Sequence, residues 1–173
     1  MTLEQPAMRH YKAVMVADAD FESAGEEPYC GLSGRIGYGA WLSLIRRQAD
    51  ESAVEMGSNC NQITFMIDDE GVICGFGQLR PIDTFDVLTW AGHIGYSVPP
   101  SLRGRGYATL LLQMLLQRAY ARGMEKVLLT CDVDNYASQR VIEKCGGKFE
   151  GLYTDQGYNK RRYWFKKEDV LHD

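Results

Sequence analysis

The residues best suited to chemistry in this chain lie in one glycine-rich stretch between a strand pattern and a helix pattern. Arg103-Gly104-Arg105-Gly106-Tyr107-Ala108 follows the Pro99-Pro100 pair and precedes the apolar run Thr109–Gln117. Glycines let a backbone approach a ligand closely, and the first turn of a helix offers unpaired N–H groups that favour an anion. Arginine adds positive charge that suits phosphate. The stretch therefore predicts a site for a ligand that carries a pyrophosphate.

Two nucleotide-binding motifs do not fit this loop. A dinucleotide-binding turn needs a third glycine where Thr109 stands, and the acid expected about 20 residues later, at Glu125, precedes the next strand pattern instead of ending it. A P-loop needs Gly-Lys-Ser/Thr, which does not occur. A coenzyme A loop of the form Arg/Gln-x-x-Gly-x-Gly/Ala fits, because Arg103, Gly106 and Ala108 occupy its positions. An ordinary glycine-rich turn with surface arginines is the remaining interpretation.

A second stretch narrows these alternatives. Glu125–Val133 is an apolar strand pattern, and Asn135–Gly147 reads as a helix that Asp134 or Asn135 caps and glycines close. With both stretches the chain resembles the GNAT acetyltransferase superfamily, whose members transfer acetyl from acetyl-coenzyme A to an amine. Arg103–Ala108 resembles its coenzyme motif, and Asn135 with Glu143-Lys144-x-Gly146 resembles its second motif.

The chain is also similar to a bacterial group of predicted acetyltransferases. The members of that group carry the sequence GHIGY before the coenzyme loop, here Gly92–Tyr96, and a Tyr-Trp strand near the end, here Tyr163-Trp164. The resemblance covers roughly residues 60–168 well and the first 50 weakly. It identifies the superfamily and leaves the substrate open.

The resemblance implies that acetyl-CoA is the acyl donor and cosubstrate. The backbone at Tyr96 and Val98 would bind the pantetheine amides as an added strand would, and the N–H groups of the loop would hold the pyrophosphate. Asn135 would fix the coenzyme from the neighbouring strand, with help from Ser138. The expected coenzyme-binding residues are Tyr96, Val98, Arg103, Gly104, Arg105, Gly106, Tyr107, Ala108, Asn135 and Ser138.

The catalytic acid and base are less directly indicated. Ile142 stands where the second motif commonly has a tyrosine, the usual acid for the thiolate, so Tyr136 becomes the candidate acid and Tyr153 an alternative. His93 is the candidate base, because its ordinary pKa of about 6.5 suits proton acceptance near neutrality. The superfamily's base more often shares a face with Ile94, so a structural role for His93, or a water chain as base, stays open.

Direct attack of the amine on the thioester is the simplest route. An acyl intermediate on Cys131 or Cys145 is an alternative, although a buried cysteine is usually a small apolar residue. The absence of tyrosine at position 142 also leaves open a non-catalytic acyl-CoA-binding or regulatory module. A donor such as succinyl-CoA would need a basic pocket near the thioester, and the sequence indicates none.

The expected acceptor is a primary amine of a small molecule or a peptide. In this superfamily the acceptor is selected by the first two helices, the loop between them and the late strands, here Glu22–Tyr38, Pro81–Trp90 and Thr154–Asn159. These segments are acidic, which suits a cationic amine such as a polyamine, an amino sugar or a lysine side chain. The aromatic residues that could flank it are Tyr29, Tyr38, Phe85 and Trp90.

The elements that must position these residues follow from hydrophobic periodicity. The resemblance implies an α+β fold with a GNAT-like mixed, mostly antiparallel central sheet and helices on both faces. The expected helices are Pro6–Phe21, Ala40–Glu55, Thr109–Gln117 and Asn135–Gly147. The expected strands are Gln62–Asp68, Val72–Arg80, Gly92–Val98, Glu125–Val133, Gly147–Tyr153 and Arg161–Phe165.

Composition excludes several classes of protein. The 173 residues are 45% hydrophobic and 24% charged, which is ordinary for a globular domain, and we expect one domain over residues 1–173. The net charge of −4 gives no electrostatic basis for binding nucleic acid or an anionic membrane.

The cysteines and the apolar runs indicate the compartment. The five cysteines are scattered and form no C-x-x-C pair, which is typical of a reducing compartment and of neither a disulfide framework nor a zinc site. The N-terminus lacks a signal-peptide pattern, and no apolar run reaches about 18 residues. We expect a cytoplasmic protein with no metal site. Homodimers are common in such folds, so a homodimer remains possible.

Overall fold

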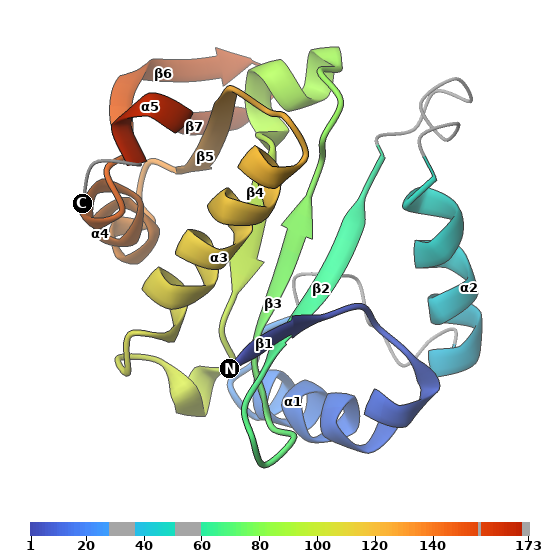
Figure 1. Ribbon diagram of the computed structural model, residues 1–173. Helices are drawn as coiled ribbons and strands as arrows, with labels where there is room; N and C mark the ends of the chain where they lie inside the picture. The colour runs from blue at the N-terminus through green and yellow to red at the C-terminus, as the bar shows by residue number, and fades with distance from the viewer. Residues whose placement is uncertain (28–36, 51–59, 156, 171–173) are drawn as a thin grey trace.

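Two antiparallel sheets form the centre of the molecule in the computed structural model, which describes residues 1–27, 37–50, 60–155 and 157–170 (Figure 1). The first sheet consists, in order, of β1 (Thr2–Glu4), β2 (Gln62–Ile67), β3 (Ile73–Leu79) and β4 (Ile94–Ser97). The second consists, in order, of β5 (Lys126–Asp132), β7 (Tyr158–Lys166) and β6 (Lys148–Asp155). The helices are α1 (Tyr11–Ser23), α2 (Tyr38–Gln48), α3 (Tyr107–Ala121), α4 (Tyr136–Lys144) and α5 (Lys167–Val170).

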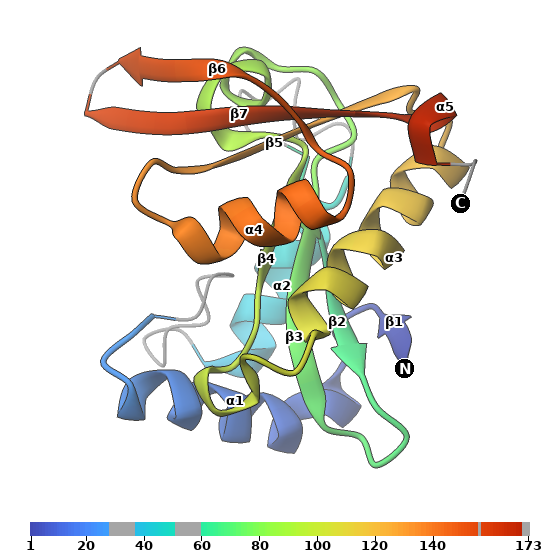
Figure 2. The ribbon, with the colours of Figure 1, turned by 90° about the vertical axis from the view of Figure 1, so that its left-hand side faces the viewer.

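Helices cover both faces of the first sheet. Phe65 of β2 lies fully buried against α1 and α2, where its ring stacks parallel to Trp41 at 6.2 Å between centroids. The neighbouring Met66 points to the opposite face and packs against α3, as the alternation of a strand requires. Figure 2 shows α4 beneath the second sheet. The core is therefore divided between the two faces of the first sheet.

Two glycines in β3 let α3 pack unusually close to the sheet. A Cβ atom at Gly75 would lie 2.7 Å from a methyl carbon of Leu111, and one at Gly77 would lie 3.0 Å from Leu115. Leu111 and Leu115 are both fully buried. The position of α3, and of the loop at its N-terminus, is thus fixed by contacts with the sheet itself.

The two sheets meet near the beginnings of β4 and β5. The backbone N–H of His93 donates to the carbonyl of Leu128 at 2.7 Å, and the N–H of Leu128 donates to Nδ1 of His93 at 2.8 Å. Gly92, with a φ of 69°, approaches so closely that a Cβ there would lie 3.0 Å from the Leu128 oxygen and 3.1 Å from the Thr130 nitrogen. Further along, β4 and β5 belong to separate sheets.

The expected α+β architecture is confirmed, with differences in detail. The first predicted helix is divided into a 3-10 turn, η1 (Met8–His10), and α1. The second predicted helix ends earlier, at Gln48, and residues 51–59 lie outside the described part of the chain. β1 and the π-helical turn η3 (Val87–Ala91) were not predicted, because three residues are too few for a visible alternation and η3 lies in an apparent loop. No helix among the described residues is long and apolar enough to cross a membrane.

Candidate functional site

A cavity of 480 Å³, here named the loop cavity, lies at the N-terminus of α3. Its walls come from the end of β4, the loop before α3 and the first turns of α4. Every residue expected to bind the coenzyme lines it except Arg105. The residues expected there and found there are Tyr96, Val98, Arg103, Gly104, Gly106, Tyr107, Ala108, Asn135 and Ser138.

The start of α3 gives the loop cavity an anion-binding wall. Gly106 is the N-cap of α3 and has no side chain that could cap the first N–H groups. Gly104 and Gly106 have φ values of 77° and 84°, a conformation that favours glycine, although the space around each is open. The unpaired N–H groups and the positive end of the helix dipole favour a negative charge here. Any anion bound here would thus meet mainly backbone groups.

Arg103 anchors this loop to the first part of the chain. Its guanidinium donates to both carboxylate oxygens of Glu26 at 2.7 and 2.6 Å, and its Nε donates to the carbonyl of Val98 at 3.1 Å. The hydrogen bonds from Arg103 lower the pKa of Glu26. Arg105 is exposed, and one of its nitrogens lies 3.4 Å from the carbonyl oxygen of Ser101. The sequence analysis predicts the same role for both arginines, but their surroundings in the structure therefore differ.

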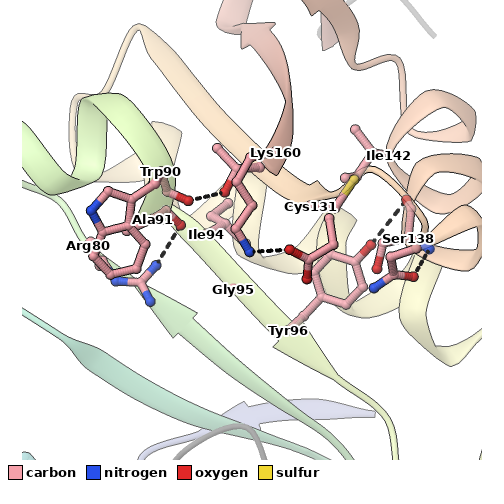
Figure 3. Close-up of a pocket in the computed structure, with 13 residues that line it drawn as sticks. Arg80, Trp90, Ala91, Ile94, Gly95, Tyr96, Cys131, Ser138, Ile142 and Lys160 are labelled. Carbon is pink, nitrogen blue, oxygen red and sulfur yellow. Dashed lines mark hydrogen bonds and ion pairs between the residues drawn. The ribbon is translucent and has the colours of Figure 1, made fainter. Parts of the chain in front are cut away.

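A second cavity, of 320 Å³ and here named the strand cavity, opens between β4 and β5 where the two sheets separate (Figure 3). Three charged side chains line it: Arg80 after β3, Asp132 at the end of β5 and Lys160 of β7. Lys160 Nζ lies 2.6 Å from Asp132 Oδ1. Ile142 of α4, at the position of the family's tyrosine, contributes an apolar wall. The strand cavity is therefore polar at one side and apolar at another.

Trp90, from the turn η3, forms one edge of the strand cavity. Its ring stacks on Tyr158 at 4.5 Å between centroids, and its indole N–H donates to Asp86 at 3.3 Å. The hydroxyl of Thr130 donates to the Trp90 carbonyl at 2.7 Å. Arg162 of β7 donates to two further carbonyls of this region, those of residues 88 and 89. These contacts fix the turn against the second sheet.

The two cavities share one boundary. Tyr96, Asn135 and Ser138 line both of them. Asn135 is the N-cap of α4, and its side-chain oxygen accepts the N–H of Ser138 at 3.0 Å. The hydroxyl of Tyr96 lies 3.5 Å from the carbonyl oxygen of Ser138, and burial raises the pKa of Tyr96. A ligand that extends from the loop cavity into the strand cavity must pass these three residues.

The two residues expected to carry acid–base chemistry lie elsewhere. His93 is 1% exposed and lines neither cavity; its Nε2 lies 2.7 Å from Asp83, and its Nδ1 accepts the N–H of Leu128. Tyr136 is 64% exposed and also lines neither cavity. The Tyr153 hydroxyl donates to Asp155, again outside both linings. Both ring nitrogens of His93 thus contact other residues, and the assignments of the base and the acid stay predictions.

The cysteines considered as nucleophiles are protonated thiols. Cys131 lines the strand cavity, and burial raises its pKa to about 11. Burial likewise raises the pKa of Cys145 to about 11, and Cys145 lines neither cavity. A thiol needs to lose its proton to act as a nucleophile. Both side chains therefore have the properties of packing residues.

Sequence reasoning missed the charged residues of the strand cavity. Arg80 follows β3, Asp132 ends β5 and Lys160 belongs to β7, so the three residues share no motif. The one available signal was the position of Asp132, a carboxylate that ends an apolar strand just before a helix cap. Of the aromatic residues proposed to flank the acceptor, Trp90 lines the strand cavity, whereas Tyr29 lies outside the described residues. Phe85 is 74% exposed and Tyr38 is buried against Trp41.

Comparisons with known proteins agree with this geometry. The model of the Acetyltransferase (GNAT) family matches residues 38–147. The uncharacterized N-acetyltransferase YnaD of Bacillus subtilis is 26% identical over 98 residues, which cover 56% of this chain and 55% of YnaD. The chain thus matches about half the length of that curated relative.

Solved structures share the fold. RimJ of Mycobacterium smegmatis, in complex with CoA-disulfide, has a TM-score of 0.72 and 21% identity, covering 99% of this chain and 84% of RimJ. A mutant of the spermidine N-acetyltransferase SpeG of Vibrio cholerae has a TM-score of 0.69 and 16% identity, covering 99% and 98% of the two chains. For yncA of Salmonella typhimurium with its cofactor acetyl-CoA, the TM-score is 0.61 at 14% identity, covering 99% and 95%.

The family match extends over more than half of the chain and includes both the coenzyme motif and the second motif. The finer likeness to the GHIGY group remains a prediction. On the match to its family model and on the shared fold, the chain belongs to the acetyltransferase (GNAT) family.

Proposed function

We propose that this protein is an N-acetyltransferase that moves the acetyl group of acetyl-CoA to a primary amine of a small-molecule or peptidyl acceptor by direct attack. One observation carries the proposal: a cavity with an anion-binding helix N-terminus joins a second, polar cavity at three shared residues. Such a pair can bind a long anionic donor in one part and its acceptor in the other. Acetyl-CoA supplies the acetyl group as an activated thioester.

The loop cavity fits the coenzyme. The N–H groups at the start of α3 would hold the pyrophosphate, and Asn135 would use its side-chain nitrogen, since its oxygen already accepts from Ser138. β4 pairs with β3 along one edge and ends its sheet, so its other edge can accept the pantetheine amides. The solved relatives RimJ and yncA, which hold CoA-disulfide and acetyl-CoA, support this assignment.

The strand cavity fits a polar amine. Asp132 offers a carboxylate that is 57% exposed, although Lys160 already occupies one of its oxygens. Trp90 offers an aromatic edge to an alkyl or cationic group. The related SpeG is named for spermidine, so spermidine belongs in a first panel with amino-acid amides, amino sugars and short peptides.

The side chains of the strand cavity favour direct attack. The neutral thiol of Cys131 is a poor nucleophile, which opposes an acyl-cysteine route. His93 uses both ring nitrogens in contacts behind the cavities, so we assign it the role of holding β4 against β5, and the amine proton leaves through water. Proximity and electrostatic positioning then supply most of the rate enhancement.

The first experiment is thermal unfolding with and without acetyl-CoA. At about 100 times the dissociation constant, a ligand stabilises a protein by about 2.7 kcal/mol, which corresponds to roughly 5–10 °C for a chain of this length. Gly106→Glu places a negative charge at the anion site and should abolish the shift. Gly123→Glu is the matched control, because Gly123 also has a positive φ (87°) and open space but lies beyond the other end of α3.

The second step separates the enzyme from a binding module. Free thiol released from acetyl-CoA on addition of a panel amine supports the transferase. A shift in unfolding temperature without thiol release from any amine favours the acyl-CoA-binding alternative. An unchanged unfolding temperature at millimolar acetyl-CoA, in wild type and both variants, contradicts the proposal.

A further inference from the structure

The inference concerns Tyr96 and rests on the function just proposed. Tyr96 is one of the three residues that line both cavities, and its side chain reaches from β4 toward α4 across their boundary (Figure 3). If phosphate binds at the start of α3 and the acceptor in the strand cavity, the reacting thioester lies where the cavities join. The Tyr96 hydroxyl is therefore at the place of reaction.

The hydroxyl of Tyr96 is only loosely held in this structure. Its distance of 3.5 Å to the Ser138 oxygen is long, because O–H···O hydrogen bonds usually measure about 2.7–2.8 Å. The Ser138 carbonyl also occupies a position in α4 where the amide of residue 142 is its helical donor. A stronger acceptor that reached the boundary would take the phenol hydrogen from this contact.

The Tyr96 phenol lines the same cavity as Ile142, which stands at the tyrosine position of the second motif. Ile142 lies one helical turn after Ser138, so the two residues share a face of α4. Tyr96 packs against the buried cluster that contains Ile142 and Cys131. Among the described residues that line the strand cavity, Tyr96 is the sole tyrosine. A hydroxyl from β4 thus reaches the wall where α4 places Ile142 instead of a tyrosine.

We infer that Tyr96 is a catalytic residue whose hydroxyl donates a hydrogen bond to the sulfur that leaves during acetyl transfer. In this step the amine nitrogen bonds to the acetyl carbon, the carbon–sulfur bond breaks, and its electron pair goes to sulfur. The nitrogen loses one proton to water, and the thiolate later takes one from water. Tyr96 keeps its proton throughout.

Hydrogen-bond donation, rather than full proton transfer, follows from relative acidity. An ordinary phenol has a pKa of about 10 and an ordinary thiol one of about 8.5, so transfer of the phenol proton to a thiolate is uphill. Burial raises the pKa of Tyr96 further, which keeps its hydroxyl protonated and able to donate. A hydrogen bond to a charged acceptor in the transition state increases the reaction rate by about 10- to 100-fold.

The test uses coenzyme A alone, so it needs no knowledge of the acceptor. The thiol of bound CoA is titrated through the ultraviolet absorbance of its thiolate, in wild type, Tyr96→Phe and Tyr136→Phe. The role of Tyr96 predicts that Tyr96→Phe lowers the acid dissociation constant of the bound thiol by about tenfold. Tyr136→Phe, which alters an exposed tyrosine outside both cavities, should match wild type.

Each outcome has a distinct meaning. CoA affinity equal to wild type with an unchanged thiol pKa in Tyr96→Phe overturns the role of Tyr96 and leaves the proposed function intact. Absence of CoA binding by wild type overturns both. For any amine that supports turnover, Tyr96→Phe should lower kcat about 10- to 100-fold with little change in KM for acetyl-CoA. A rise in KM at unchanged kcat would instead show that Tyr96 only binds the coenzyme.

Discussion

Apart from Glu26, the loop cavity takes its wall from two short stretches, residues 96–109 and 135–141. The strand cavity instead draws one to three residues at a time from elements spread between Arg80 and Lys160. The first is shaped by backbone conformation and a helix end, so its properties follow from local sequence. The second exists because two strands that meet at His93 and Leu128 then separate. The proposed donor site is thus a local property of this chain, and the proposed acceptor site is a property of the whole fold.

The sharpest way to break the comparison is to disturb the junction of the strands. Gly92→Ala should destabilise the protein by about 3–4 kcal/mol, because the new Cβ would press on the β5 backbone in addition to the cost of a positive φ. Gly71→Ala is the control: its φ is also positive, but the space around it is open, so about 1 kcal/mol is expected. Urea unfolding measures both. Equal losses of unfolding free energy in the two variants would show that the close approach of Gly92 to β5 does not contribute to stability.

Substitutions of the His93 side chain test the same junction between β4 and β5. His93→Ala leaves the buried N–H of Leu128 without its acceptor and should cost about 2–3 kcal/mol. His93→Asn can place an oxygen near the position of Nδ1, so it should recover about half of that loss, as measured by chemical unfolding. For an amine that supports turnover, the pH profile of His93→Asn should follow wild type. Loss of the acidic limb of that profile, which a base produces because its protonation at low pH stops catalysis, would restore His93 as the base.

Substitutions of the two arginines of the loop test the part of the comparison that concerns the loop cavity. Arg103→Met removes the contacts with Glu26 and Val98 that position the loop, and should weaken acetyl-CoA binding about tenfold. Arg105→Met should change it less than about twofold, because Arg105 lines neither cavity. Calorimetric titration with acetyl-CoA measures both affinities. The opposite order would mean that Arg105 binds phosphate directly.

The smallest effect is expected at the cysteine of the strand cavity. Cys131→Ser conserves size and removes the thiol, and because burial keeps that thiol protonated we expect less than about a threefold change in amine-dependent thiol release. Cys145→Ser, outside both cavities, is the companion variant. Loss of transfer in Cys131→Ser alone would favour the acyl-cysteine route.

The loop cavity could be predicted because its determinants are consecutive. The glycines at 104 and 106 predict positive φ values, and Asn135 predicts a helix N-cap. Each of these features depends only on a residue and its immediate neighbours. The elements that carry them, α3, β5 and α4, lie within a few residues of their expected bounds. Because interactions between neighbouring residues determine these features, they can be predicted from a single sequence.

The remaining features of the site depend on contacts between residues that lie far apart in the sequence, and motif spacing does not predict such contacts. The pairing of Arg103 with Glu26 joins residues 77 apart, and that of His93 with Leu128 joins residues 35 apart. Alternation along β4 shows that His93 and Ile94 face opposite ways, but not which side will hold a cavity. Tyr136 and Tyr96 were both visible as tyrosines, and only the packing of β4 against α4 shows which one reaches the boundary.

The separation of β4 from β5 has one further consequence. A strand at the end of a sheet presents unpaired backbone groups, and such edges commonly promote aggregation through the recruitment of another protein's strand. Here the end strands of both sheets face a shared opening that is closed at one end by the contacts of Gly92 and His93. We expect this opening to admit one narrow, extended guest and to exclude a broad β-hairpin. A strand edge that could promote aggregation would here select its guest by width.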